Sequence, residues 1–294
     1  MNAMTKSSIA RRAAPVAAAA LLSLLASCGG GGDSGSAVSN MTVTATGGLV
    51  GYGKNISLNV SGSGLNSGVN AAIEPGCFTM ARGATSEGSM TFSCRLLAVG
   101  DLRVRVRTAE GKELATLRLE VEAPRVEFTA KQNATEGKFV VELDPNNAPK
   151  TAENFMVYVN TGSCWYKDRL FHRVIPDRLV QGGGFIAGLQ PAPGVAAAIP
   201  LESQNGLKNL RGTIGMARQS EPNTATSQFY INVKDNPDFD YASDAQPGYA
   251  VFGKVVSGIE TVDLISKVPT MSKGDAFPDA PIDNVVITAC SQIR

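Results

Sequence analysis

The stretch F-H-R-V-I-P-D-R-L-V-Q-G-G-G-F, residues Phe171–Phe185, decides how the rest of this chain is interpreted. Leu170–Ile175 is rich in β-branched and aromatic residues, and Pro176-Asp177 is a turn signal, so the stretch predicts two strands joined by a turn. Arg173 lies inside the first apolar strand, where a charge is costly to bury unless it is paired. From this stretch alone, Arg173 is either a structural ion-pair partner or a functional cation.

A second stretch, Gly212–Val233, reads G-T-I-G-M-A-R-Q-S-E-P-N-T-A-T-S-Q-F-Y-I-N-V and places two short apolar strands around a polar loop. Gln228 and Tyr230 are two positions apart and therefore share one strand face. Together with F-H-R-V-I-P, Q-G-G-G-F and the motif Y-A-V-F-G-K-V-V at Tyr249–Val256, this stretch resembles the cyclophilin family of peptidyl-prolyl isomerases. The resemblance covers residues 125–294 and is strongest to the bacterial periplasmic branch.

The resemblance implies a mainly β fold for residues 125–294, a closed eight-stranded antiparallel barrel with two capping helices. The residue pattern alone predicts only a β-rich domain with two helical segments. Besides the strands above, it predicts a hairpin, two helices and a final strand: Val126–Thr129 with Gly137–Leu143, Lys150–Tyr158 capped by Thr151, Ile259–Lys267, and Val285–Ala289.

Residues 38–123 form a separate predicted domain of short alternating strands divided by Gly and Ser turns. The pattern favours a small β-sandwich, immunoglobulin-like in outline. Arg103, Arg105 and Arg107 alternate with apolar residues, which is typical of a solvated sheet face rather than of a binding site. The expected strands are Met41–Ala45, Ile56–Val60, Met90–Leu96, Leu102–Arg107 and Leu114–Val121.

Residues 1–27 are expected to be a signal peptide, with an apolar region, Ala13–Leu25, that is too short to span a membrane. Leu25-Ala26-Ser27-Cys28 resembles the lipobox of bacterial lipoproteins, which implies that Cys28 is acylated and anchors the chain to a membrane. The alternative is an ordinary signal peptide with a chance cysteine. Residues 28–37 read as a Gly/Ser-rich tether. The residue after Cys28 is Gly29 and not the aspartate that retains lipoproteins at the inner membrane of enteric-type bacteria. We therefore expect a periplasm-facing protein of the outer membrane.

Composition and charge argue against nucleic-acid binding and against a multi-histidine metal site. The 294 residues are 43% hydrophobic and 18% charged with a net charge of +1, and no basic patch indicates nucleic-acid binding. His172 is the single histidine, which excludes multi-histidine metal sites, and we expect neither metal nor cofactor. Apart from Cys28, four cysteines remain. An oxidising compartment and membership of the same domain predict the disulfides Cys77–Cys94 and Cys164–Cys290.

The implied reaction is rotation about the peptide bond that precedes proline, which faces a barrier of ~18–20 kcal/mol from amide resonance. Neither a nucleophile nor a cofactor is required. In the twisted amide the proline nitrogen regains its lone pair and can accept a hydrogen bond. The resemblance assigns that donor to Arg173, with Gln181 and Gln228 orienting it and binding the peptide backbone.

The resemblance also implies a substrate-binding pocket. Leu179, Tyr230 and Phe239 would hold the proline ring, Ala217 and Arg218 would meet the residues before it, and Tyr249 replaces a histidine of some members. The alternative for the apolar residues is ordinary barrel core. The full substrate-binding set is Phe171, Leu179, Met216, Ala217, Arg218, Tyr230, Phe239 and Tyr249.

Three positions depart from the family pattern. Arg178 and Asp238 stand where apolar residues are usual, unless Phe239 shifts by one to cover the second position, and Tyr230 replaces a phenylalanine. Because tight cyclosporin binding in the family depends on a tryptophan at the position of Asp238, the resemblance implies a largely cyclosporin-insensitive protein. The expected function is a monomeric isomerase acting on proline-containing polypeptides of the cell envelope. The alternative is a non-catalytic proline-peptide-binding module or holdase.

Overall fold

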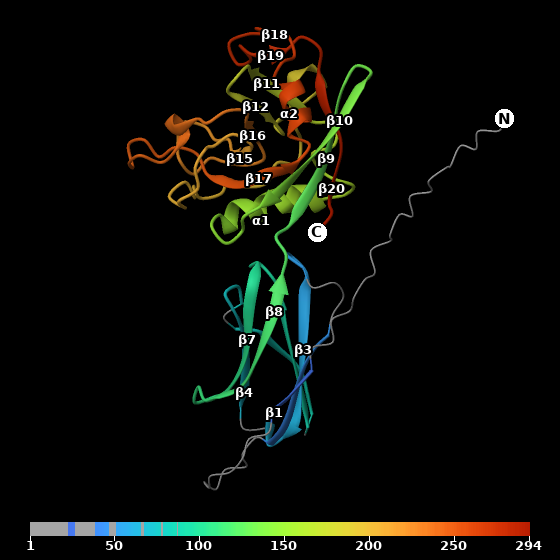
Figure 1. Cartoon of the computed structure of the whole chain (residues 1–294), viewed down its shortest axis with the longest axis vertical. Coiled ribbons are helices and arrows are strands. Elements are labelled where there is room, and N and C mark those ends of the chain that lie inside the picture. Colours follow the sequence, from blue (N-terminus) through green and yellow to red (C-terminus); the bar gives the residue numbers. More distant parts are fainter. Residues whose placement is uncertain (1–22, 27–38, 47–50, 66–67, 78, 87) are drawn as a thin grey trace, which may run out of the picture.

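The structure is a computed structural model that describes residues 23–26, 39–46, 51–65, 68–77, 79–86 and 88–294. The proposed tether and Cys28 lie outside these residues, as does most of the proposed signal peptide. Figure 1 shows two units stacked along the long axis, an N-terminal pair of sheets and a C-terminal unit that carries both helices. Neither of these two helices has the length and apolar character that crossing a membrane requires.

The N-terminal unit consists of a five-stranded sheet, in the order β1-β2-β3-β6-β5, and a three-stranded sheet, β4-β7-β8. All their pairings are antiparallel. Side chains from both sheets, such as Leu58, Phe92, Val104 and Leu117, share one buried core. The strands are β1 (Ser23–Ala26), β2 (Ser39–Thr46), β3 (Asn55–Ser63), β4 (Val69–Glu74), β5 (Ala81–Ser86), β6 (Ser89–Arg95), β7 (Gly100–Thr108) and β8 (Glu113–Val121).

Three of these strands were not among those predicted from the alternation of apolar and polar residues. Every residue of β5 is exposed, so it carries no apolar alternation. The strand β4 has three consecutive buried residues, Ala71–Ile73, rather than alternation. The strand β1 lies in the apolar part of the proposed leader, where its backbone pairs with β2. The arginine stripe of β7 faces solvent as expected, with Arg105 and Arg107 both paired to Glu74.

Each unit contains one of the predicted disulfides. Cys77 and Cys94 are bonded with their Cα atoms 6.5 Å apart. Cys164 and Cys290 are bonded with a Cα separation of 5.7 Å, which ties the segment after the first helix to the last strand. Both separations lie within the range that disulfides span.

The C-terminal unit is a closed barrel of eight strands in the order β10-β17-β15-β16-β12-β11-β20-β9, as the resemblance implied. Its interior is a cluster of buried rings that includes Phe128, Phe139, Phe155, Phe229 and Phe252. The strands are β9 (Arg125–Gln132), β10 (Thr135–Leu143), β11 (Leu170–Ile175), β12 (Leu179–Gly182), β15 (Thr213–Met216), β16 (Phe229–Asn232), β17 (Val251–Ser257) and β20 (Val285–Gln292).

Two helices and several short elements complete this unit. The helix α1 (Pro149–Asn160) buries Phe155 against the barrel rings, and α2 (Ile259–Ile265) packs beside β10. The short elements are β13 (Phe185–Ile186), η2 (Ala187–Leu189), β14 (Gln190–Pro191), η3 (Pro237–Phe239), β18 (Thr270–Met271) and β19 (Ala280–Pro281).

The start of α1 differs from its prediction, because Thr151 lies inside the first turn and is not the cap. The residue at the cap position is Ala148, which has no side-chain oxygen. Glu202 supplies the acceptors instead, taking the N–H groups of Lys150 and Thr151 at 3.0 and 2.8 Å and the Thr151 hydroxyl at 2.7 Å. A carboxylate is favoured there because a helix N-terminus carries partial positive charge.

The two units touch beside α1. Asn146 accepts from the backbone N–H of Val99 at 3.2 Å and donates to the carbonyl of the same residue at 3.0 Å. Arg95 forms an ion pair with Glu153 of α1 at 2.9 Å. Tyr52 of the N-terminal unit is buried with the barrel's core cluster. The sheets are therefore fixed to the barrel by polar and apolar contacts together.

Candidate active site

A cavity of about 480 Å³ opens where β11, β12 and β16 meet the loops that flank β15 and β17. Its wall combines apolar rings, one glutamine and three arginines. The lining residues are Arg173, Ile175, Arg178, Leu179, Gln181, Ala217, Arg218, Tyr230, Phe239 and Tyr249. The structure thus brings together eight of the residues selected from the sequence.

Two of the selected substrate-binding residues lie elsewhere. Phe171 is 1% exposed and its ring packs on Phe139 and Phe229 inside the barrel. Met216 is equally buried in the same core. Both follow the barrel's alternation and point inward, so their role is to support the wall rather than to line it.

Arg173 extends from β11 with 43% of its side chain exposed to the cavity and solvent. Its Nε donates to Oδ2 of Asp279 at 3.4 Å, and the backbone carbonyl of Asp279 accepts the N–H of Val174 at 2.9 Å. Asp279 immediately precedes β19, more than a hundred residues along the chain. Asp279 is not predictable from the sequence, because no motif near it indicates a contact with β11.

The two glutamines behave differently from the prediction. Gln181 lies opposite Arg173 in the β11–β12 register, but its Nε2 donates to Oε1 of Gln228 at 3.0 Å. Among the described residues, the hydrogen bond from the Arg173 side chain goes to Asp279 instead. Gln228 immediately precedes β16, and its side chain lies close against Gly184.

Three rings form the apolar end of the cavity. Tyr230, Phe239 and Tyr249 meet edge to face, with centroid separations of 5.3–5.9 Å. The Tyr230 hydroxyl, the group that distinguishes it from phenylalanine, donates to Oδ1 of buried Asn209 at 2.6 Å. Burial raises the pKa of Tyr230 well above its usual value, so this hydroxyl stays protonated. Tyr230 therefore contributes a neutral, hydrogen-bonded ring to this end of the wall.

The rim carries the two substitutions that depart from the family pattern. Arg178 and Asp238 form an ion pair at 2.5 Å, and the Arg178 guanidinium lies 4.7 Å from the centre of the Phe239 ring. Phe239 therefore occupies the apolar cavity and Asp238 occupies the rim. The paired charges and the cation–π contact offset part of the desolvation cost at this edge.

Arg218 closes the opposite side of the aromatic cluster. Its Nε donates to the carbonyl of Gly248 at 3.0 Å, and its Nη1 donates to the carbonyls of Gln219 and Ser220, each at 2.8 Å. The guanidinium also stacks over Tyr249 at 4.8 Å from the ring centre. These contacts fix the guanidinium in one place beside the cavity.

His172 takes no part in the cavity wall. It is 5% exposed, its ring lies 4.6 Å from that of Phe185, and its Nδ1 has no hydrogen-bond partner among the described residues. Burial lowers the pKa of His172 to about 4, so the imidazole is neutral at physiological pH.

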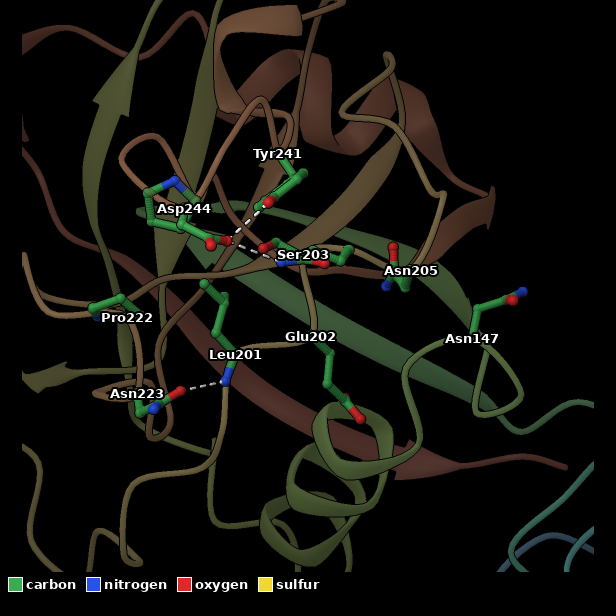
Figure 2. Close-up of a pocket in the computed structure, with 11 residues that line it drawn as sticks. Asn147, Leu201, Glu202, Ser203, Asn205, Pro222, Asn223, Tyr241 and Asp244 are labelled. Atoms are coloured by element: carbon green, nitrogen blue, oxygen red, sulfur yellow. Dashed lines mark hydrogen bonds between the residues drawn. The ribbon is translucent and has the colours of Figure 1, made fainter.

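A second cavity, of about 620 Å³, lies near the start of α1 (Figure 2). Two pairs of its lining residues are hydrogen-bonded: Asn223 accepts from the Leu201 N–H at 2.9 Å, and Asp244 accepts from the Tyr241 hydroxyl at 2.9 Å (Figure 2). Glu202 is committed to the α1 N-terminus. This cavity contains none of the residues selected from the sequence, so we assign the active site to the smaller one.

Residues 125–292 match the family model described as cyclophilin type peptidyl-prolyl cis-trans isomerase. The chain belongs to the cyclophilin family. The match spans the barrel and the whole cavity wall. This cyclophilin is a peptidyl-prolyl cis-trans isomerase, as its bacterial relatives of that name indicate.

Three relatives illustrate the similarity. A peptidyl-prolyl cis-trans isomerase of Acinetobacter baylyi is 49% identical over 138 residues, 47% of this chain and 71% of the relative. The isomerase cyp18 of Streptomyces antibioticus is 44% identical over 161 residues, 54% of this chain and 95% of the relative. Isomerase B of Escherichia coli is 40% identical over 153 residues, 51% of this chain and 91% of the relative.

Proposed function

We propose that this cyclophilin accelerates X–Pro isomerisation in proteins of the cell envelope, with Arg173 stabilising the twisted amide. The observation that carries the catalytic part is the position of Arg173 in the wall of a cavity that also presents Leu179, Tyr230 and Phe239. A proline ring would fill the apolar end while the guanidinium faces the reacting amide.

The hydrogen bonding of Arg173 supports this role. Asp279 engages Nε, and among the described residues both Nη groups are left without a hydrogen-bond acceptor. A fixed guanidinium with free Nη donors is suited to the nitrogen lone pair that appears when the amide twists. A charge-assisted hydrogen bond is worth ~1.5–3 kcal/mol, which corresponds to about tenfold to a hundredfold in rate. The rest of the acceleration would come from the shape and dryness of the cavity.

Refolding of a protein whose slow phase is limited by proline isomerisation tests the proposal on a polypeptide. We expect catalytic amounts of the full chain to increase the slow-phase rate, since uncatalysed isomerisation takes tens to hundreds of seconds. The Arg173→Ala variant should lose this effect. An unchanged slow phase with the wild-type chain would contradict the proposal.

The envelope location rests on the leader. Residues 1–27 have the features of a signal peptide, and Leu25-Ala26-Ser27-Cys28 would yield an acylated Cys28 on the tether 28–37. We expect a monomer held at a membrane surface with its isomerase unit in the periplasm. Incorporation of a labelled fatty acid, lost in Cys28→Ser, tests the anchor. A wild-type chain that stays unlabelled and remains with the soluble fraction would contradict it.

A holdase is the alternative, favoured by the charged pair Arg178–Asp238 at a rim where the family resemblance implies apolar residues. A holdase would suppress aggregation of unfolded clients equally well in wild type and Arg173→Ala, with no change in the slow refolding phase. The isomerase proposal expects the opposite pattern, because rate and not yield would depend on Arg173.

A further inference from the structure

The three arginines of the active-site cavity differ in how their charge is compensated. Arg173 is paired with Asp279, and Arg178 is paired with Asp238. In the described part of the chain Arg218 forms no ion pair, because its hydrogen bonds go to three backbone carbonyls. Carbonyl groups hold the guanidinium in place but do not neutralise it. The cavity therefore presents one uncompensated positive charge at a fixed position.

The geometry of Arg218 leaves donors available to a ligand. Its Nε and Nη1 are occupied, whereas within the described residues Nη2 donates to no acceptor. Stacking on Tyr249 further restricts the side chain. A guanidinium that is already immobilised loses little additional conformational freedom when it binds a carboxylate, and its fork geometry suits that partner.

Arg218 also lies within reach of a peptide whose proline fills the apolar end. Tyr249 separates the guanidinium from Tyr230 and Phe239, since it contacts both rings and carries Arg218 on its own face. An extended peptide advances about 3.3–3.6 Å per residue. One or two of its residues therefore span the width of the Tyr249 ring, from the proline-binding end to the Arg218 guanidinium.

We propose that Arg218 makes this cyclophilin selective for X–Pro segments that carry an acidic side chain within two residues of the proline. The inference rests on the proposed use of this cavity for catalysis. Because the site is open to solvent, the preference should be modest, about threefold to tenfold in kcat/KM for Glu over Gln, as expected for a partly screened ion pair. It should weaken as ionic strength rises through the range where the Debye length falls below about 10 Å.

The test uses the full chain and short peptides with one proline, in which Glu, Gln or Lys occupies each position within two residues of it. Magnetisation-exchange NMR measures the cis–trans rate of every peptide without a coupling protease. The readout is the ratio of kcat/KM for Glu to that for Gln at one position in one enzyme preparation. A ratio is insensitive to partial unfolding, because both peptides meet the same active fraction.

We expect the Glu-to-Gln ratio to exceed about three at one of these positions, and the Lys-to-Gln ratio there to fall below one, a discrimination typical of a partly exposed charge. Arg218→Gln should bring the ratio to about one, and Arg218→Lys should retain part of it because the charge remains. The double variant Arg178→Gln/Asp238→Asn is the matched control. It removes a neutral pair from the same cavity, so the ratio should persist.

A wild-type ratio near one at every position would overturn the inference while leaving the isomerase proposal intact. A clear ratio that survives Arg218→Gln would also overturn it, since the selectivity would then come from another group. Failure of the wild-type chain to accelerate any of the peptides would instead contradict the proposed function itself, and this inference with it.

Discussion

The Nε atom of Arg173 lies 3.4 Å from Oδ2 of Asp279. Arg173 belongs to β11, whereas Asp279 belongs to the turn between β18 and β19 and is tied to β11 by the N–H of Val174. A carboxylate on Nε orients the plane of the guanidinium and leaves its two Nη groups available to donate to a ligand. The proposed catalytic donor is thus positioned by a residue that lies outside the barrel strands.

Removing the charge of Asp279 should therefore slow the enzyme without unfolding it. We expect Asp279→Asn to lower kcat/KM by about threefold to tenfold, since a partly exposed ion pair contributes on the order of 1 kcal/mol. The control is Asp275→Asn, which removes an exposed carboxylate from the same turn. If both variants match the wild type in exchange rates, Asp279 does not position Arg173.

Glu202 should contribute measurably to stability through the first turn of α1. Replacement by Gln removes a charge that accepts two backbone N–H groups at the helix N-terminus, so the free energy of unfolding should fall by about 1 kcal/mol. Glu260→Gln is the comparison, because Glu260 is an exposed acid in the first turn of α2. Chemical denaturation measures both. Equal losses would show that the contacts of Glu202 add nothing specific.

His172 should make stability depend on pH. Its folded-state pKa is lowered from 6.5 to about 4 by burial, so below pH 6.5 the unfolded chain binds a proton that the folded chain refuses. The stabilisation is complete above pH 6.5 and is lost as the pH falls towards 4, by up to about 3 kcal/mol.

The measurement for His172 is urea denaturation of wild type and His172→Gln at several pH values between 4 and 7. The variant lacks the titrating group, so the difference between the two unfolding free energies should change across this interval. Other acids titrate in both chains and cancel. Parallel curves would mean that the pKa of His172 is not lowered in the folded protein.

Cyclosporin should inhibit this cyclophilin poorly. Asp238, paired with Arg178, stands at the rim position to which the family resemblance assigns the tryptophan that tight binding needs. Because Phe239 already forms part of the cavity wall beside Tyr230, Asp238→Trp should improve inhibition, whereas Phe239→Trp should not. Burial of one aromatic side chain is worth ~1.5–3 kcal/mol, or about tenfold or more in affinity. Nanomolar inhibition of the wild type would contradict this placement of the rim.

The barrel was accessible from the sequence because its motifs lie on the strands that build it. Leu170–Ile175 and the segment at β16 carry β-branched and aromatic residues, and the resemblance supplied their closure into eight strands. In contrast, β5 is exposed along its whole length. Its position depends on pairing with β6, and no single-sequence pattern records such a pairing.

Contacts between distant segments were the part of the site that could not be predicted. Glu202 replaces the expected cap Thr151, and Asp279 replaces the glutamines as the partner of Arg173. Phe171 and Met216 carry motif positions but follow the inward face of the barrel. In each case the closed barrel determines which side chains meet. The spacing of residues along the sequence does not reveal those contacts.

The central claim is that Arg173 provides the hydrogen bond that lowers the rotational barrier. Magnetisation-exchange NMR on an Ala-Pro peptide, with the full chain and its Arg173→Ala, Arg173→Lys and Arg118→Ala variants, tests it most directly. Arg118 is a distant arginine with 74% of its side chain exposed, so its loss should leave the rate unchanged. Loss of Arg173 should reduce kcat/KM by about tenfold to a hundredfold or more at an unchanged melting temperature, and Lys should not restore it. Equal rates for wild type and a folded Arg173→Ala would contradict the account.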